Sequence, residues 1–296
     1  LHYPLRRQRQ MCIRDSVIHI DIDPSTINKN IKVHCPVVGD AKSVISQLDE
    51  SIPLTFKPDK AERDEWFAQI KEWESTHPTV ANQKGKVIKT SYAIDTLSKI
   101  TKGKAVVVTD VGQHQMWVAQ YYQFENPRNQ ITSGGLGTMG FGFPAAIGAQ
   151  FARPNDIVIA VVGDGGYQMT LCELATAAIH KLPVKILVLN NHYLGMVRQW
   201  QELFFDNRES GVDLEGNPDF VKLAEAYGIK GFNIKRPADV GKILGKALSY
   251  NDGPCVINAE CIKTENVFPM IPAGAALEDM LTEPPKQKMA KPVGST

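Results

Sequence analysis

The sequence lacks several features that would assign it to a class of protein at once. Its 296 residues contain five cysteines and no Cys-x-x-Cys pair, so the sequence predicts neither a structural zinc site nor a disulfide framework. The formal net charge is only +1 at pH 7, which gives no electrostatic reason to expect nucleic acid or a membrane surface as a partner. No apolar run approaches the roughly 18 residues that a bilayer span requires. These absences favour a soluble protein of a reducing compartment, and we expect a cytoplasmic location.

Composition and local pattern divide the chain into five segments. Residues 1–16 are rich in arginine and have neither a hydrophobic period nor the apolar stretch of a signal peptide, so we interpret them as foreign sequence without a fold. We expect 17–52 to be the end of one domain and 53–84 to be a linker helix flanked by prolines. Residues 85–282 are expected to form a second domain, and residues 283–296 a flexible tail. Because the ordered part starts inside a strand, we expect a fragment of a longer protein.

Strands and helices alternate along the second domain. The strands expected at 104–112, from Asp156 to the glycines at 163–166, at 183–191 and at 253–261 are solid apolar runs rather than alternating ones, and a further strand is expected at 229–234. The helices expected around them are 90–101, 113–122, 144–152, 169–180, one from about 195, 218–227 and 237–250. The sequence therefore predicts an α/β fold, with a parallel sheet covered by helices on both faces. In such sheets ligands bind beyond the carboxyl ends of the strands.

A Gly-x-Gly-x-x-Gly pattern at 135–140 does not meet the requirements of a dinucleotide-binding fingerprint. That fingerprint needs a strong strand directly before it and an acidic residue about 20 residues later, at the end of the next strand. Here the preceding run 129–132 is weak, and Asp156 stands before the next strand. The glycines fit either a flexible turn or a close approach of the backbone to a ligand, because glycine has no Cβ.

Two polar residues stand where neighbouring buried strands are expected to end. Asp164 is surrounded by Gly163, Gly165 and Gly166, and Asn191 follows the next apolar run. One carboxylate and one amide oxygen suit Mg²⁺ when phosphate oxygens supply further ligands. The exposed backbone N–H groups of the glycines, with a helix expected from Met169, would suit the phosphate. In the alternative interpretation, Asp164 caps the next helix and Asn191 only turns the chain.

The stretch from Gly163 to Asn191 resembles the thiamine diphosphate motif, in which Gly-Asp-Gly is followed after about 26 residues by Asn-Asn. Together with "VGQHQMWVAQ", "ITSGGLGTMGFGFPAAIGAQ", "NNHYLGMVRQWQELFF" and "VFPMIPAGAALEDM", it resembles the catalytic large subunit of acetolactate (acetohydroxyacid) synthase over residues 17 to about 281. The resemblance implies a thiamine diphosphate-binding fold preceded by the tail of a Rossmann-like, FAD-binding middle domain. It implies the condensation of pyruvate, after decarboxylation, with a second 2-ketoacid (pyruvate or 2-ketobutyrate) in the cytoplasm of a bacterium.

The resemblance also implies roles for individual residues. Mg²⁺ would be bound by Asp164, the side chain of Asn191 and the backbone carbonyl of Tyr193, and Met139 would be the apolar wedge under a bent cofactor. Gln113 and His114 would hold the diphosphate, and Gly137 would meet the aminopyrimidine. The full set that it places around the cofactor is Val111, Gly112, Gln113, His114, Gly137, Met139, Gly163, Asp164, Gly165, Gly166, Asn191, Tyr193, Leu194, Gly195 and Met196. The cofactor carries the chemistry, while the protein bends and desolvates it.

Met196, Val197 and Trp200 share one helical face that Phe204 extends, a pattern that by itself favours core packing. The resemblance instead implies that these three residues line the pocket of the second ketoacid, and that Ala273 lies at a herbicide-sensitive rim. His180 and His192 are interpreted as ordinary surface or loop histidines.

Asp21 lies at a strand end and Asp40 in a Gly-Asp turn, 19 residues apart. The resemblance implies that both match positions in the family's middle domain that contact FAD. In the alternative interpretation they are only turn and cap residues. The glutamate that activates the cofactor in this family belongs to an N-terminal domain that this sequence lacks, so we expect little activity from the chain alone. The resemblance further implies a homodimer or larger assembly with active sites between chains, and a possible regulatory small subunit. Two alternatives stay open: another thiamine diphosphate enzyme, such as pyruvate oxidase or glyoxylate carboligase, and a non-catalytic cofactor-binding fragment.

Overall fold

The computed structural model describes residues 16–53, 59–272, 275 and 279–284. Contacts divide the chain into two compact units, Leu1–Pro78 with Pro269–Thr282 and Thr79–Phe268 with Glu283–Thr296. None of the described helices is long and apolar enough to cross a bilayer. Most of the foreign segment and of the tail expected from the sequence lies outside the described residues.

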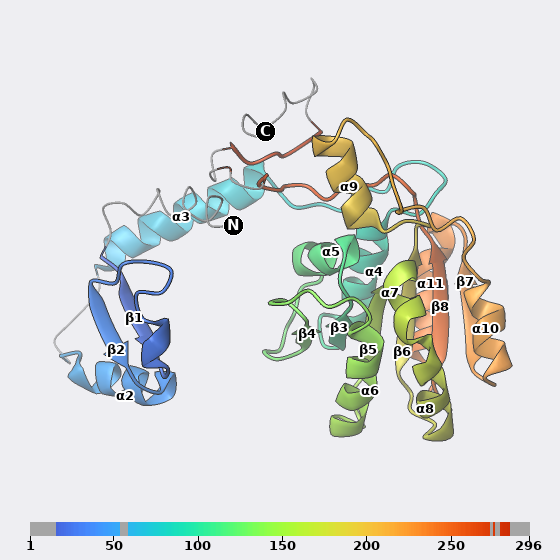
Figure 1. Ribbon diagram of the computed structural model, residues 1–296, viewed down its shortest axis with the longest axis horizontal. Coiled ribbons are helices and arrows are strands. Elements are labelled where there is room, and N and C mark those ends of the chain that lie inside the picture. Colours follow the sequence, from blue (N-terminus) through green and yellow to red (C-terminus); the bar gives the residue numbers. More distant parts are fainter. Residues whose placement is uncertain (1–15, 54–58, 273–274, 276–278, 285–296) are drawn as a thin grey trace. The chain divides into compact units, whose positions relative to one another are not determined.

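The described residues of the first unit form a two-stranded parallel sheet and two α-helices (Figure 1). Strand β1 (Ile18–Asp21) pairs with β2 (Cys35–Val38), and a short 3₁₀ turn, Pro24–Thr26, lies between them in the sequence. Helix α2 (Ala41–Ser51) begins at its N-cap Asp40, and α3 (Lys60–Thr76) begins at its N-cap Asp59. Neither helix contains a buried residue.

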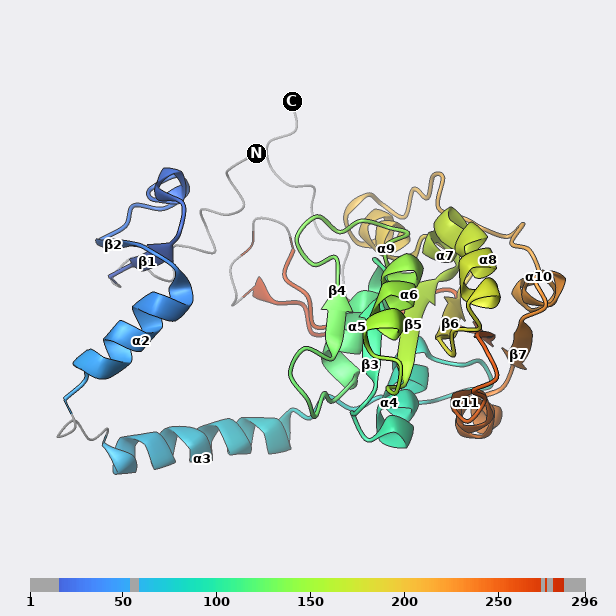
Figure 2. The same ribbon diagram turned by 90° about the horizontal axis from the view of Figure 1, so that it is seen from below.

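The second unit is built on a six-stranded sheet in the order β4-β3-β5-β6-β8-β7, in which every pair is parallel. Figure 1 labels the six strands in this order, and Figure 2 shows the same unit from below. The strands are β3 (Val106–Thr109), β4 (Gln130–Thr132), β5 (Val158–Gly163), β6 (Lys185–Asn190), β7 (Lys230–Ile234) and β8 (Cys255–Glu260). The apolar runs β5 and β6 lie side by side in the interior of the sheet, and β6 is buried along its whole length. The predicted α/β fold with a parallel sheet is confirmed.

Each face of this sheet carries its own apolar core. Helices α4 (Thr90–Thr101), α5 (Gln113–Tyr121) and α11 (Val240–Leu248) pack on one face, where Val107, Val161 and Leu187 point toward them. On the other face α6 (Gly142–Ala152), α8 (Leu174–Ile179) and α10 (Phe220–Ala226) cover the neighbouring strand positions. Burying each aliphatic side chain in this way stabilises the fold by about 1.5–3 kcal/mol.

The expected helix 169–180 is wrong in its start and its continuity. Helix α7 (Asp164–Thr170) begins at Asp164 itself, after the N-cap Gly163, and a 3₁₀ turn (Leu171–Glu173) separates it from α8. The adjacent glycines of α7 predict a loop by propensity. They are helical here because both pack tightly: a Cβ at Gly165 would lie 2.5 Å from Leu194 Cδ2, and one at Gly166 would lie 2.8 Å from Asp110 Oδ1.

Other boundaries differ by a few residues. The predicted helix 237–250 is a 3₁₀ turn at Pro237–Asp239 followed by α11, and the helix expected from about 195 is α9 (Gly195–Phe204). The weak run before the glycine-rich stretch is a strand, β4, because it pairs with β3 at the edge of the sheet.

Candidate functional site

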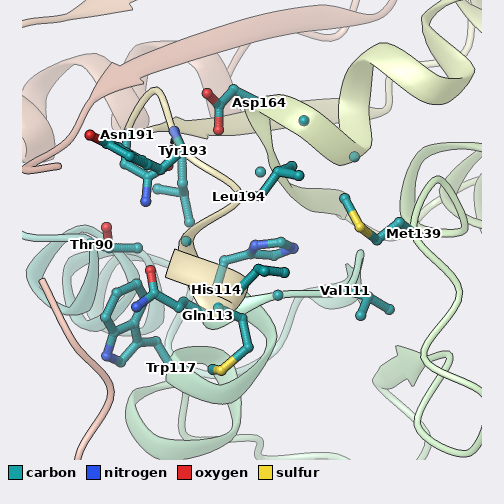
Figure 3. Close-up of a pocket in the computed structure, with 18 residues that line it drawn as sticks. Thr90, Val111, Gln113, His114, Trp117, Met139, Asp164, Asn191, Tyr193 and Leu194 are labelled. Carbon is teal, nitrogen blue, oxygen red and sulfur yellow. Dashed lines mark hydrogen bonds between the residues drawn. The ribbon is translucent and has the colours of Figure 1, made fainter. Parts of the chain in front are cut away.

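A pocket lies at the carboxyl ends of three strands of the larger sheet (Figure 3). Its walls come from the turn after β3, from the start of α7 after β5, and from the turn between β6 and α9. Met139 closes another side, and Thr90 and Trp117 come from α4 and α5. This is the position at which parallel α/β sheets bind ligands.

The structure brings nearly all of the predicted cofactor residues together around this one pocket. The residues that line it are Thr90, Val111, Gly112, Gln113, His114, Trp117, Met139, Gly163, Asp164, Gly165, Gly166, Leu189, Asn191, Tyr193, Leu194, Gly195, Met196 and Val197. Of the predicted cofactor set, Gly137 is the residue that does not line the pocket. It adopts φ +65° and donates its N–H to the Ser133 carbonyl at 2.9 Å.

Asp164 is a buried carboxylate, only 1% exposed, at the first position of α7. Its Oδ2 accepts a hydrogen bond from Asn217 Nδ2 at 2.5 Å, whereas its Oδ1 is buried without a hydrogen-bond partner. Burial raises the pKa of Asp164 to about 6. The N-cap of α7 is Gly163 and Asp164 is the first helical residue, so Asp164 is not the helix cap that the alternative interpretation expected.

Asn191 also lies at the pocket, one residue beyond β6. Its Oδ1 accepts the Tyr193 N–H at 3.1 Å, and His192 between them adopts φ +58°. This is the tight turn that the alternative interpretation expected. In Figure 3 the side chains of Asn191 and Asp164 lie on the same side of the pocket. Within the described part of the chain, no group of three or more His, Cys, Asp or Glu side chains could hold a metal, so an ion here would depend on one carboxylate, an amide or backbone oxygen, and the ligand itself.

Gln113 and His114 enter the pocket from the N-terminus of α5. Gln113 donates through Nε2 to Gln199 Oε1 at 2.8 Å and to the Glu265 carbonyl at 2.9 Å, and its Oε1 is buried without a partner. His114 is also buried with an unpartnered Nε2, and burial lowers its pKa to about 4, so the ring is neutral at pH 7. Each unpaired buried polar atom costs about 1–3 kcal/mol, which a polar ligand in the pocket would relieve.

Two glycines stand where a side chain would crowd the polar groups of the pocket. A Cβ on Gly195 would lie 2.1 Å from Gln113 Oε1, and one on Gly163 would lie 3.2 Å from the His114 ring. The pocket thus combines unpaired polar atoms with bare backbone, a combination that fits a phosphate-bearing cofactor and a divalent ion.

Asp110 has a structural role that the sequence did not reveal. Its fully buried carboxylate accepts N–H groups from Val111 at 2.6 Å, from Gly140 at 3.0 Å and from Gly142 at 3.3 Å. The Gly140 amide directly follows Met139, so this carboxylate holds the loop that carries Met139 to the pocket. In the sequence, the position of Asp110 at the end of an expected strand was the one feature that could have indicated this role.

A second group of residues anchors the segment after β8 and was also not predicted. Gln199 donates to the Val267 carbonyl at 3.0 Å and accepts the Val267 N–H at 2.8 Å. The Glu265 carboxylate accepts the Thr90 N–H and the Ser91 hydroxyl, both at 2.7 Å, at the start of α4. These contacts join positions 68 or more residues apart, which no local pattern can indicate.

The three predicted substrate residues all lie on α9, but only two of them line the pocket. Met196 and Val197 line the pocket, and Val197 is 48% exposed, so it is not the core residue that the helical pattern alone favoured. Trp200 does not line the pocket; its ring lies 5.0 Å from that of Phe204. Ala273 lies outside the described residues.

The two predicted FAD residues make the local contacts of the alternative interpretation. Asp21 Oδ1 accepts the Asp23 N–H at 2.9 Å, and Asp40 caps α2 by accepting the Ser43 N–H at 3.0 Å. Asp21 is the last residue of β1, and Asp40 lies two residues beyond the end of its parallel neighbour β2. Outside this unit, the His180 ring contacts the Phe151 ring edge to face with ring centroids 5.3 Å apart, and His192 Nε2 lies 3.3 Å from Glu260 Oε2.

Comparisons with known proteins agree with the position of the pocket. Residues 110–259 match the family model described as thiamine pyrophosphate enzyme, C-terminal TPP binding domain, and residues 5–48 match the model of the central domain of the same enzymes. The acetolactate synthase large subunit of Haemophilus influenzae is 40% identical over 277 residues, 94% of this chain and 48% of that protein. The isozyme 3 large subunit of Escherichia coli is 42% identical over 273 residues, 91% of this chain and 47% of that protein, and the large subunit of Lactococcus lactis is 43% identical over 265 residues, 90% and 45%.

The chain thus spans about half the length of the curated relatives it matches. The matches confirm the resemblance to acetolactate synthase large subunits that the motifs predicted. The matched C-terminal domain includes β5, β6 and most of the pocket wall. This chain belongs to the family of thiamine pyrophosphate enzymes.

Proposed function

We propose that this chain is part of an acetolactate synthase, which decarboxylates pyruvate and condenses the product with a second 2-ketoacid, pyruvate or 2-ketobutyrate. The single observation that carries the proposal is the pocket itself. Fourteen of the fifteen predicted cofactor residues line it, although they come from four separate stretches of the sequence. The large-subunit relatives support the choice of reaction.

In this proposal Asp164, the Asn191 side chain and the Tyr193 carbonyl hold Mg²⁺, which in turn holds the diphosphate. Asp164 Oδ1 is buried and unpaired, as a ligand awaiting a cation would be. When bound, thiamine diphosphate supplies the electron sink that makes loss of CO₂ from a 2-ketoacid possible.

The chain's own residues bind the cofactor, orient it and exclude water from it. Gln113 and His114 meet the diphosphate with their free polar atoms, and Met139, held through Asp110, supports the cofactor from the apolar side. We also propose that the backbone of Gly137 contacts the aminopyrimidine ring of the cofactor. Met196, Val197 and Trp200 select the second ketoacid. Trp200 would need a change of position for this role, because it does not line the pocket here.

Further parts of the proposal concern the assembly. We assign Asp21 and Asp40 to contacts with a structural FAD, and the residues around them to the middle domain of the enzyme. A homodimer or larger assembly would supply the activating glutamate from another domain, and a regulatory small subunit is a possible partner. The described cysteines are all free, which supports a cytoplasmic location.

Cofactor binding and turnover test the proposal separately. Isothermal titration calorimetry measures the binding of thiamine diphosphate to three samples. They are the wild-type chain with Mg²⁺, the wild-type chain with EDTA, and an Asp164→Ala variant with Mg²⁺. We expect binding with Mg²⁺, and at least tenfold weaker binding in the other two samples. Acetolactate formation from pyruvate is then measured for the chain alone and with the N-terminal half of a relative's large subunit added.

The outcomes separate the candidate functions. Absence of Mg²⁺-dependent binding would contradict the proposal. Binding with acetolactate formed only after the N-terminal half is added would support it. Binding with no turnover in either sample would favour a non-catalytic cofactor-binding module, and a different product from pyruvate and 2-ketobutyrate would favour another enzyme of the family.

A further inference from the structure

Asn217 contacts the proposed metal site from a loop that none of the cofactor motifs includes. It lies in the stretch "GVDLEGNPDF", 53 residues beyond Asp164. Its Nδ2 donates to Asp164 Oδ2 at 2.5 Å and to Asn190 Oδ1 at 3.2 Å. One amide group therefore joins the carboxyl ends of β5 and β6, between which the proposed ion would sit.

The loop that carries Asn217 is hydrogen-bonded to the turn that carries Asn191 and Tyr193. The Leu194 N–H donates to the Val212 carbonyl at 2.8 Å, and the Leu214 N–H donates to the His192 carbonyl at 2.9 Å. Tyr193 and Asp213 form an antiparallel bridge between these two bonds. We call residues 212–217 the latch. Its backbone is thus tied to the same turn that would offer the Tyr193 carbonyl to the ion.

Helix α7 sets the orientation of the Asn217 amide. Gln168 Nε2 donates to Asn217 Oδ1 at 2.8 Å, so the oxygen of Asn217 faces α7 and its NH₂ group faces the two acceptors. Gln168 stands one helical turn after Asp164 and also donates to the Asp164 carbonyl at 3.3 Å. The orientation of the amide is therefore determined by its contacts.

We propose that Asn217 is a positioning residue for the metal: by holding Asp164 Oδ2, it aims Oδ1 of the same carboxylate at the ion. This inference rests on the proposed function and extends it to a residue outside the ligand set. Asp164 Oδ1 is the atom that is buried and unpaired, and Oδ2 is already occupied by the amide. A carboxylate with one oxygen held by a hydrogen bond loses less rotational freedom when the other oxygen binds a cation.

Replacement of Asn217 should therefore weaken metal binding without removing a ligand. Mn²⁺ binding to the 296-residue chain is measured by electron paramagnetic resonance at saturating thiamine diphosphate, for wild type, Asn217→Ala and Asn217→Leu. Groups that orient metal ligands typically contribute 10–100-fold to affinity, so we expect the Mn²⁺ Kd to rise about tenfold or more in both variants. Leucine has the same branching as asparagine, with two terminal groups on Cγ, so it removes the hydrogen-bond donor without leaving a cavity.

Asn233→Ala is the matched control. Asn233 accepts one side-chain amide hydrogen bond, from Asn258 at 3.2 Å, and lies on β7, which β6 and β8 separate from β5. The Mn²⁺ Kd of this variant should equal that of wild type. The thermal midpoint of each variant is recorded without metal, because a merely structural role would lower the midpoint and leave the Mn²⁺ Kd of the folded fraction unchanged.

Gln168→Ala keeps the experiment decisive if both Asn217 variants fail to fold. It leaves the latch intact but frees the Asn217 amide to rotate, and we expect a smaller rise of the Mn²⁺ Kd, about threefold. If wild type binds Mn²⁺ and the folded variants have the same Mn²⁺ Kd, the positioning role of Asn217 is wrong, but the proposed function stands. Failure of wild type to bind Mn²⁺ with thiamine diphosphate would instead overturn the proposed function.

Discussion

Two buried ionisable side chains in the pocket respond to pH in opposite directions. Burial raises the pKa of Asp164 from 3.8 to about 6, so the metal-free fold loses stability as pH rises through this range and the carboxylate ionises. Burial lowers the pKa of His114 from 6.5 to about 4, so the fold loses stability as pH falls from 6.5 and the proton cannot be taken up. Each difference corresponds to about 3 kcal/mol, and the two effects largely offset each other between pH 4 and 6.5.

The first prediction is that Asp164→Asn stabilises the metal-free chain in a pH-dependent way. At pH 7.5 the variant no longer buries an ionised carboxylate, and we expect its free energy of unfolding to exceed that of wild type by about 1–3 kcal/mol. At pH 4 the wild-type side chain is protonated, and the two proteins should be equally stable. Urea denaturation with EDTA at both pH values measures this, with the exposed turn residue Asp252→Asn as control. If the variant is no more stable than wild type at pH 7.5, burial does not raise the pKa of Asp164.

At the scale of the element, helix α6 offers a matched pair of glycines. A Cβ on Gly142 would lie 2.6 Å from Asp110 N and 2.9 Å from Asp110 Cα, whereas a Cβ on Gly148 would meet nothing within 4 Å. We expect Gly142→Ala to destabilise the chain by about 1–3 kcal/mol or more, because backbone atoms must move. Gly148→Ala should stabilise it by about 0.5–1 kcal/mol through helix propensity. Thermal unfolding of both variants tests this; equal effects would mean that the start of α6 is not packed as described.

The elements also show how far the sequence could lead. The solid apolar runs predicted β5, β6 and β8 because a buried parallel strand needs no polar face, and Asp164 and Asn191 followed from the ends of those runs. The start of α7 was not predictable, because its glycines are helical only through packing against Leu194 and Asp110. The positioning contact of Asn217 was not predictable either, since it depends on a loop that folds back over 53 residues.

At the scale of the whole molecule, burial differs sharply along the chain. None of the described residues from Ser16 to Pro78 is buried, and large apolar side chains such as Ile22 and Trp66 are 72% and 55% exposed. The sheet of the second unit, in contrast, has a core on both faces. A segment without buried apolar area has little free energy to offset the cost of ordering its backbone, because helices in proteins draw most of their stability from packing an apolar face.

We therefore predict two regimes of amide hydrogen exchange within the 296-residue chain. Amides of β5, β6 and β8 should exchange only through global unfolding of their unit, whereas those of α2 and α3 should exchange within about 100-fold of unstructured peptides. Thiamine diphosphate with Mg²⁺ should slow exchange in β5 and β6 in proportion to its binding free energy and leave α2 and α3 unchanged, because a ligand stabilises only the unit whose folding creates its site. Exchange followed by mass spectrometry, with and without EDTA, distinguishes these cases. Protection of α2 and α3 equal to that of β6 would mean that this segment obtains a core from contacts outside its own residues.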